Sequence, residues 1–186
     1  MEPTPGQTVG PFFAFGLEYD GDARLVPPGS PGAIRLHGRV LDGEGRGIPD
    51  ALVEVWQADA GGRVVQQSGA LHRDGHTFTG WGRCGTDRTG TYSFTTLVPG
   101  PVSGTDDGGP PYFALAVFAR GLMDRLFTRA YLSDHGADER DPLLASLEPA
   151  RRATLVAMAD EQGYHFDIRL QGGDETVFLS YAGTQD

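Results

Sequence analysis

Short runs of alternating apolar and polar residues, each bounded by glycine or proline, limit what this chain can fold into. Its 186 residues include 28 glycines and 13 prolines, which interrupt helices and end strands. A run that alternates between apolar and polar residues predicts a strand with one buried face. We expect seven strands, at residues 34–41, 51–56, 91–97, 112–119, 125–131, 164–170 and 176–180. The chain is therefore expected to be mainly β.

One short helix is predicted near the end of the chain, at residues 150–159. Pro149 suits a first helical turn, because the N–H that proline lacks would be unpaired there anyway. Leu155, Val156 and Met158 supply an apolar side for the helix.

The first 31 residues predict an extended N-terminal arm. Residues 1–31 are dense in proline, glycine and aromatic side chains. Gly10 and Pro11 interrupt residues 8–13, so we expect no regular helix there. With aromatic residues such as Phe12, the arm must pack on its own domain or on a partner.

Long loops separate the predicted strands. Residues 59–90 have no sustained period, residues 102–111 are rich in glycine and proline, and residues 133–148 predict a loop with short turns. Loops of this length in a compact domain are usually functional or irregular. The pattern favours a β-sandwich or a partly open barrel, and the length fits a single domain over residues 1–186.

Composition excludes several classes of function. The formal net charge of −10 argues against a nucleic-acid-binding surface, and no apolar run approaches the length of a membrane helix. The start of the chain lacks a signal-peptide pattern, so we expect a cytoplasmic location. The single cysteine, Cys84, excludes an internal disulfide and a cysteine-rich zinc site, and we expect it to be a buried, inert thiol.

The residues give weak evidence of catalysis on their own. His72 and His76 are four apart, but the Arg-Asp-Gly between them predicts a turn, so a metal pair is a weak hypothesis. His37 and His165 lie on predicted strands, where we expect surface or cross-strand contacts. The G-x-S-x-G pattern of a serine hydrolase is absent. No catalytic residue is predicted from the pattern.

Several colinear segments together resemble the intradiol ring-cleavage dioxygenases. The segments span nearly the whole chain: residues 4–13 (TPGQTVGPFF), 52–59 (LVEVWQAD), 81–83, 90–94, 98–101, 118–121 (FARG), 128–131, 164–172 (YHFDIRLQG) and 175–178. The resemblance implies an antiparallel β-sandwich core, in agreement with the strand pattern. It also implies a ferric iron held by two tyrosines and two histidines, because anionic phenolates stabilise that hard ion and a catecholate substrate then chelates it.

The residues at the implied iron positions cannot hold the metal. Val102 follows the Pro-Gly-Pro turn, where iron-binding members have a tyrosine. Tyr112 and Ala114 stand in place of the two histidines, and Gly109 in place of an arginine before them. No tyrosine lies within residues 58–91, where the other ligand is expected. We therefore predict no metal ligand in this chain.

The resemblance is to the α chain of the family's two-chain enzymes. In these enzymes a β chain of the same fold holds the Fe(III), and the active site lies where α and β meet. By position, the substrate contacts carried over are Thr8, Gly10, Pro11 and Phe12 on the arm, and Arg120 after the 112–119 strand. Phe12 departs from the tyrosine that is commoner there. Arg120 is suited to hold a benzoate carboxylate or to set a positive potential for it.

The implied activity is intradiol cleavage of 3,4-dihydroxybenzoate with O₂ to 3-carboxy-cis,cis-muconate, by a hetero-oligomer of α and β chains. Two simpler interpretations stay open. Residues 8–12 could be a packed terminal strand, and Arg120 could pair with an acid such as Asp124. A different class of function also stays open, namely a non-catalytic sandwich module that binds an aromatic acid or a protein partner.

Overall fold

The computed structural model describes residues 6–65, 74, 77–102, 109–136 and 141–181. Nine strands and three short helices lie within this part of the chain. The strands are β1 (Ala33–Leu41), β2 (Leu52–Trp56), β3 (Trp81–Gly85), β4 (Thr91–Leu97), β5 (Tyr112–Phe118), β6 (Leu126–Leu132), β7 (Val156–Asp160), β8 (Gly163–His165) and β9 (Ile168–Arg169). The helices are α1 (Phe12–Leu17), α2 (Pro142–Ala145) and α3 (Pro149–Ala153).

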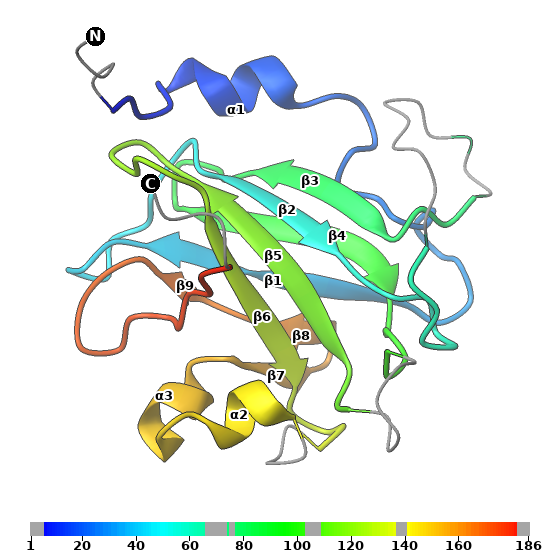
Figure 1. Cartoon of the computed structure of the whole chain (residues 1–186). Helices are drawn as coiled ribbons and strands as arrows, with labels where there is room; N and C mark the ends of the chain where they lie inside the picture. Colours follow the sequence, from blue (N-terminus) through cyan, green and yellow to red (C-terminus); the bar gives the residue numbers. More distant parts are fainter. Residues whose placement is uncertain (1–5, 66–73, 75–76, 103–108, 137–140, 182–186) are drawn as a thin grey trace, which may run out of the picture.

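The strands form two layers that enclose the core (Figure 1). One layer has the order β3-β2-β5-β6, and pairing continues through β7 and β8 to β1 and β4 behind it. The interior between the layers is filled by buried apolar side chains from both, including Val53, Phe94, Phe113 and Ile168. The mainly-β class is thus confirmed. The sheet is mixed instead of antiparallel throughout, because β1 pairs in parallel with β8 and β9, and β6 with β7.

The predicted helix at 150–159 was wrong in its second half. Helix α3 ends at Ala153, and residues 156–160 form strand β7. The chain leaves the helix because Tyr131 N–H donates to Leu155 O at 2.8 Å, which starts the parallel pairing with β6. Leu155 is fully buried beside α2, so tertiary packing outweighs the helical pattern here.

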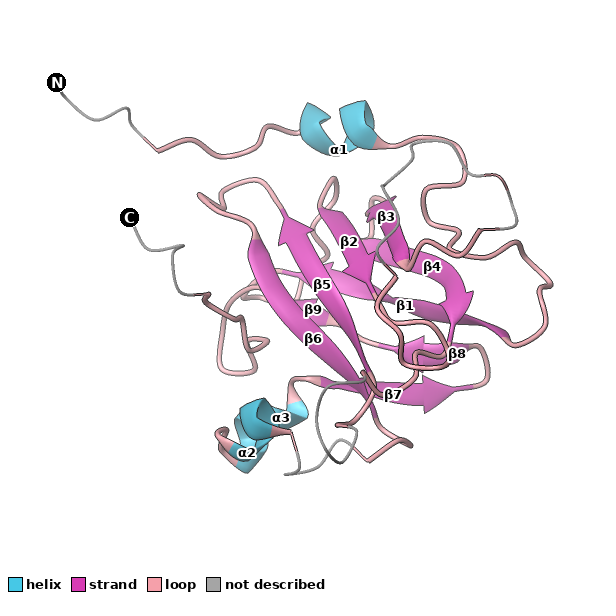
Figure 2. Ribbon diagram, turned by 45° about the vertical axis from the view of Figure 1, so that its right-hand side comes forward, coloured by secondary structure: helices cyan, strands magenta, loops and turns pink. Residues whose placement is uncertain are grey.

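The arm was predicted to be extended, but it contains α1, and α2 lies in the predicted 133–148 loop (Figure 2). Pro11 has φ −65° and ψ −20°, so the proline that interrupts residues 8–13 also starts a helix after itself. At α2, the Asp141 side chain accepts from Leu143 N–H and so caps the first turn, with Pro142 as the first helical residue. The prediction of one helix was therefore wrong: the described residues contain three.

The end of the chain follows the predicted faces but not the predicted strands. The run 164–170 is split into β8 and β9, while its alternate apolar residues are buried as predicted. Residues 176–180 form no regular strand. They are held by single contacts, such as the Leu179 N–H donating to Phe127 O at 2.7 Å. Strand β3 lies inside the predicted 59–90 loop and pairs with β2.

Candidate functional site

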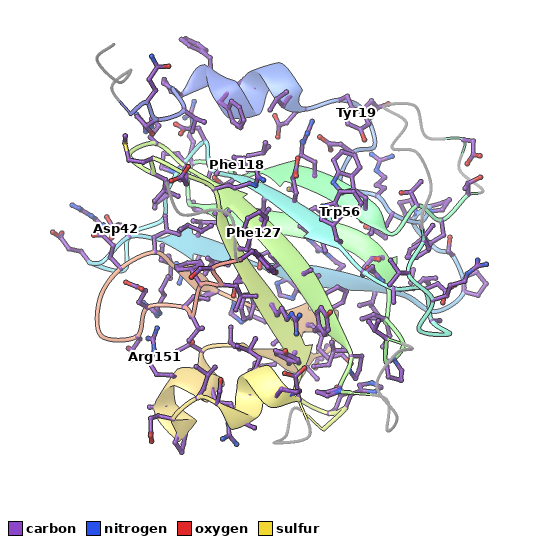
Figure 3. All side chains as sticks on the ribbon, viewed as in Figure 1. Tyr19, Asp42, Trp56, Phe118, Phe127 and Arg151 are labelled. Atoms are coloured by element: carbon purple, nitrogen blue, oxygen red, sulfur yellow. The ribbon has the colours of Figure 1, made fainter. Side chains whose placement is uncertain are left out.

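The arm lies across the end of the β2–β5 layer and presents aromatic rings to solvent (Figure 3). Phe13 packs on Phe118, which Figure 3 labels at the end of β5, with 5.4 Å between ring centroids, and Ala14 of the same helix is buried. On the other side of the helix, Phe12 is 81% exposed and Phe15 is 67% exposed. Helix α1 therefore uses one face to dock on its own chain and leaves a second apolar face uncovered.

The structure brings Thr8 and Arg120 to one place. The Thr8 hydroxyl oxygen accepts a hydrogen bond from Gly121 N–H at 2.8 Å, so the arm is tied to the residue directly after Arg120. Gly121 has φ +88°, a conformation that glycine adopts without strain and that turns the chain back toward β6. Gly10, Pro11 and Phe12 follow along the arm and are exposed, so the five predicted contact residues share one end of the molecule.

Arg120 does form an ion pair, but with a residue that the sequence did not single out. Its Nε lies 3.1 Å from Asp50 Oδ1, whereas the sequence suggested Asp124 as a partner. The Arg120 side chain is 50% exposed and that of Asp50 only 9%. The guanidinium is thus anchored at Nε and open to solvent at its other end.

An open cleft of about 300 Å³ lies between the arm and the β5–β6 turn. Gln7 and Val9 of the arm line one side, and Phe118, Leu122 and Arg125 line the other. The cleft adjoins the Thr8–Gly121 contact, so the arm forms a wall of this space.

A second cavity, of about 370 Å³, lies at the implied iron position. Val102, Gly109 and Tyr112 line it, together with Arg129 and Asp141 from β6 and the start of α2. The Arg129 Cζ atom lies 4.3 Å from the centre of the Tyr112 ring. Arg129 Nη1 donates to Tyr131 Oη at 3.0 Å and lies 3.6 Å from Asp141 Oδ2. A guanidinium and its partners occupy this region.

These residues do not fit a ferric iron. Val102 and Gly109 offer no side-chain donor, and Tyr112 lies under the positive charge of Arg129. Burial raises the pKa of Tyr131 well above its ordinary value, although Arg129 opposes the shift, so this phenol stays neutral. Within the described part of the chain, no group of three or more His, Cys, Asp or Glu side chains could hold a metal ion. A further cation here would be repelled by the guanidinium.

Of the two predictions for histidine pairs, one can be checked. His37 and His165 are paired in register on β1 and β8, with rings stacked at 5.4 Å, so the predicted cross-strand contact is confirmed. Each ring also contacts a carboxylate at 2.9 Å, Asp160 for His37 and Asp167 for His165. His72 and His76 lie outside the described residues.

Cys84 on β3 is partly buried, and burial raises the pKa of its thiol to about 11. The thiol is therefore neutral at ordinary pH, as expected for an inert cysteine.

Comparison with known proteins decides the family. A profile described as dioxygenase matches residues 9–172. The chain belongs to this dioxygenase family. It is 37% identical to the protocatechuate 3,4-dioxygenase alpha chain of Burkholderia cepacia, over 96% of this chain and 98% of that one. It is also 33% identical to the protocatechuate 3,4-dioxygenase beta chain of the same organism, over 86% of this chain and 74% of that one.

A solved structure agrees with this assignment. The dioxygenase domain of a dioxygenase carbohydrate-binding protein fusion from Streptomyces sp. SirexAA-E superposes with a TM-score of 0.58 at 25% identity. The superposition covers 92% of this chain and all of that domain. No helix among the described residues is long and apolar enough to cross a membrane. The intradiol dioxygenase family depends on Fe(III). The chain is thus a family member whose own residues at the implied iron position do not suit the metal.

Proposed function

We propose that this chain is the iron-free α subunit of a protocatechuate 3,4-dioxygenase. The complex cleaves 3,4-dihydroxybenzoate with O₂ between its two hydroxyl-bearing carbons and yields 3-carboxy-cis,cis-muconate. One observation carries the proposal: in a chain with full-length similarity to an alpha chain, the cavity at the implied iron position is lined by Val102, Tyr112 and Arg129. The Fe(III) is held by a β chain of the same fold.

The proposed role of this chain is to complete the partner's active-site pocket. Gly10 and Pro11 give a thin, stiff backbone that can approach an aromatic ring, and Phe12 extends the apolar surface beside it. Arg120 supplies hydrogen-bond donors for the ring carboxylate of the substrate. The Thr8–Gly121 hydrogen bond supports a shared site, because it holds the arm beside Arg120.

The uncovered face of α1 supports a protein partner at this end. Phe12 and Phe15 expose most of their ring surface on a helix of six residues, and such adjacent rings are usually covered in an assembly. The proposed assembly is an αβ hetero-oligomer in the cytoplasm, in which residues 1–186 form one domain with residues 1–31 as its arm.

Co-purification through a tag on this chain, from the organism that encodes it, tests the proposal. We expect a second chain of similar fold, iron, and oxygen uptake that depends on 3,4-dihydroxybenzoate. A single chain with neither iron nor uptake would contradict the proposal and favour the binding-module alternative. Stoichiometric ferric iron in the isolated chain would also contradict it.

A further inference from the structure

Asp50 and Arg120 lie opposite each other where two neighbouring strands end. Strands β2 and β5 are antiparallel, and their paired residues include Leu52 opposite Phe118. Continuing this register by two residues sets Asp50 against Arg120, where Asp50 Oδ1 lies 3.1 Å from Arg120 Nε. Strand register therefore fixes the contact, which is not a chance encounter of two mobile surface side chains.

The turn that carries Asp50 is held rigidly. Thr86 accepts from Ala51 N–H at 2.9 Å through its hydroxyl oxygen, and the same hydroxyl donates to Ile48 O at 2.8 Å. Asp50 has φ +57°, the one residue other than glycine with a positive φ in the described part of the chain. This conformation is unfavourable for most residues, and where it persists the surroundings hold it in place.

Burial divides the pair into an anchor and a free end. The Asp50 side chain is 9% exposed, and that of Arg120 is 50% exposed. The two Nη atoms of Arg120 make no hydrogen bond within the described residues, so four N–H donors remain open. Because a guanidinium is planar, fixing its Nε also fixes the plane in which the Nη groups point.

We propose that Asp50 is a positioning residue that orients Arg120 toward the ring carboxylate of the substrate. This inference rests on the proposed function and on the role of Arg120 within it. Because the Asp50–Arg120 pair carries no net charge, it does not attract the substrate over a long range. It helps binding by orienting the Arg120 guanidinium and by reducing the side-chain entropy that Arg120 loses when the substrate binds. Asp50 therefore favours substrates that carry a carboxylate on the ring over catechols that lack one.

The test uses the complex of this chain with its co-purified partner. In Asp50→Gly the anchor is removed, and glycine accepts the positive φ without strain, so folding is preserved. We expect KM for 3,4-dihydroxybenzoate to rise about tenfold, with kcat within about twofold of wild type. Catechol, measured as a substrate or as a competitive inhibitor, should be unaffected. Asp50→Asn, which keeps an oxygen that can accept from Nε, should restore most of the loss.

Three further variants separate the possible outcomes. Asp124→Asn removes an exposed carboxylate close in sequence to Arg120. It should change neither KM for 3,4-dihydroxybenzoate nor the binding of catechol. In an Arg120→Gln background, Asp50→Gly should add no further loss, because both changes affect one interaction. If Arg120→Gln raises KM but Asp50→Gly does not, or if Asp50→Gly weakens both ligands equally, the positioning role is overturned and the proposed function stands. If wild-type complex takes up no oxygen, the proposed function itself fails.

Discussion

At the scale of single residues, the guanidinium of Arg129 is the group in the cavity that most disfavours a further cation. It contacts Tyr112, Tyr131 and Asp141 and so connects β5, β6 and the start of α2. Burial lowers the pKa of Arg129, but the hydrogen bond to Tyr131 and the surrounding charges raise it overall, so the group stays charged. A partly buried cation with three partners is thus a structural element of this chain.

Replacing Arg129 should therefore destabilise the chain. Arg129→Met leaves Asp141, whose side chain is 11% exposed, without its cation and removes a donor from Tyr131. We expect a loss of about 1–3 kcal/mol in the free energy of unfolding, measured by urea denaturation. The matched control is Arg46→Met, which removes an arginine that is 71% exposed and should leave the midpoint unchanged. Equal midpoints for the two variants would contradict this role.

Cys84 allows a prediction about pH. Burial raises its pKa from 9.0 to about 11. Between these two pH values the thiol is mostly neutral in the folded chain and mostly ionised in the unfolded chain. Alkylation by iodoacetamide should be slow at pH 8 in the native chain and fast in urea, followed by mass spectrometry. The sign for stability is also fixed: this group favours unfolding as the pH rises from about 9 toward 11, because only the unfolded thiol loses its proton there. Rapid native alkylation at pH 8 would contradict the burial effect.

At the same scale, the sequence predicts the absence of iron ligands better than it predicts the ion pairs of the site. The residues at the implied iron positions, such as Val102 and Ala114, can be read directly from colinear segments. The pairs Asp50–Arg120 and Arg129–Asp141 cannot, because each joins residues on different elements whose proximity depends on strand register and on the placement of α2. A single sequence carries no periodic signal for such contacts.

At the scale of elements, alternation predicts strands well and local propensity predicts the helices poorly. Strand β4 has the predicted bounds, and Tyr92 and Phe94 are buried as its alternation predicts, whereas Thr96 instead of Leu97 continues the buried face. Residues 156–160 have helical neighbours and apolar spacing, yet they form β7, because an edge of β6 is available for parallel pairing. Helix α1 starts at the proline that was expected to exclude it. Short helices depend on caps and packing more than on their own sequence.

Strand β1 supplies a prediction at this scale, because it is paired on both sides. A Cβ atom added at Gly38 would lie 2.0 Å from Phe166 O, in the backbone that joins β8 to β9. Gly38→Ala must therefore push these strands apart, and we expect a loss of about 1–3 kcal/mol in unfolding free energy, measured by urea denaturation. Gly173→Ala is the control, since no atom lies within 4 Å of its Cβ position. A Gly38→Ala variant as stable as this control would contradict the close approach.

At the scale of the whole molecule, the hydrophobic core is buried, whereas the end that carries the arm has an exposed apolar surface. The interior between the two layers is closed by residues of this chain alone. The arm instead exposes Phe12 and Phe15, and its Thr8 is hydrogen-bonded to Gly121, next to the half-exposed Arg120. We therefore expect the isolated chain to fold, to be colourless and to hold no stoichiometric iron, measured by metal analysis and visible absorption. Tyrosinate-to-iron absorption in the isolated chain would contradict this.

The last prediction concerns assembly through α1. Phe15 is 67% exposed on the free face of the helix, so Phe15→Ser removes apolar surface without opening the core. The thermal midpoint of the isolated chain should stay unchanged, while the affinity for the proposed β-chain partner falls about tenfold or more, measured by sedimentation or titration. Met158→Ser is the matched control: Met158 is 60% exposed on β7, at the opposite end of the molecule from α1 in Figures 1 and 2. Because both side chains are exposed to a similar extent, a loss of affinity confined to Phe15→Ser assigns the contact to the arm. Equal affinities for the two variants would mean that the partner does not bind at α1. The arm residues would then not contact a substrate bound in the partner's active site.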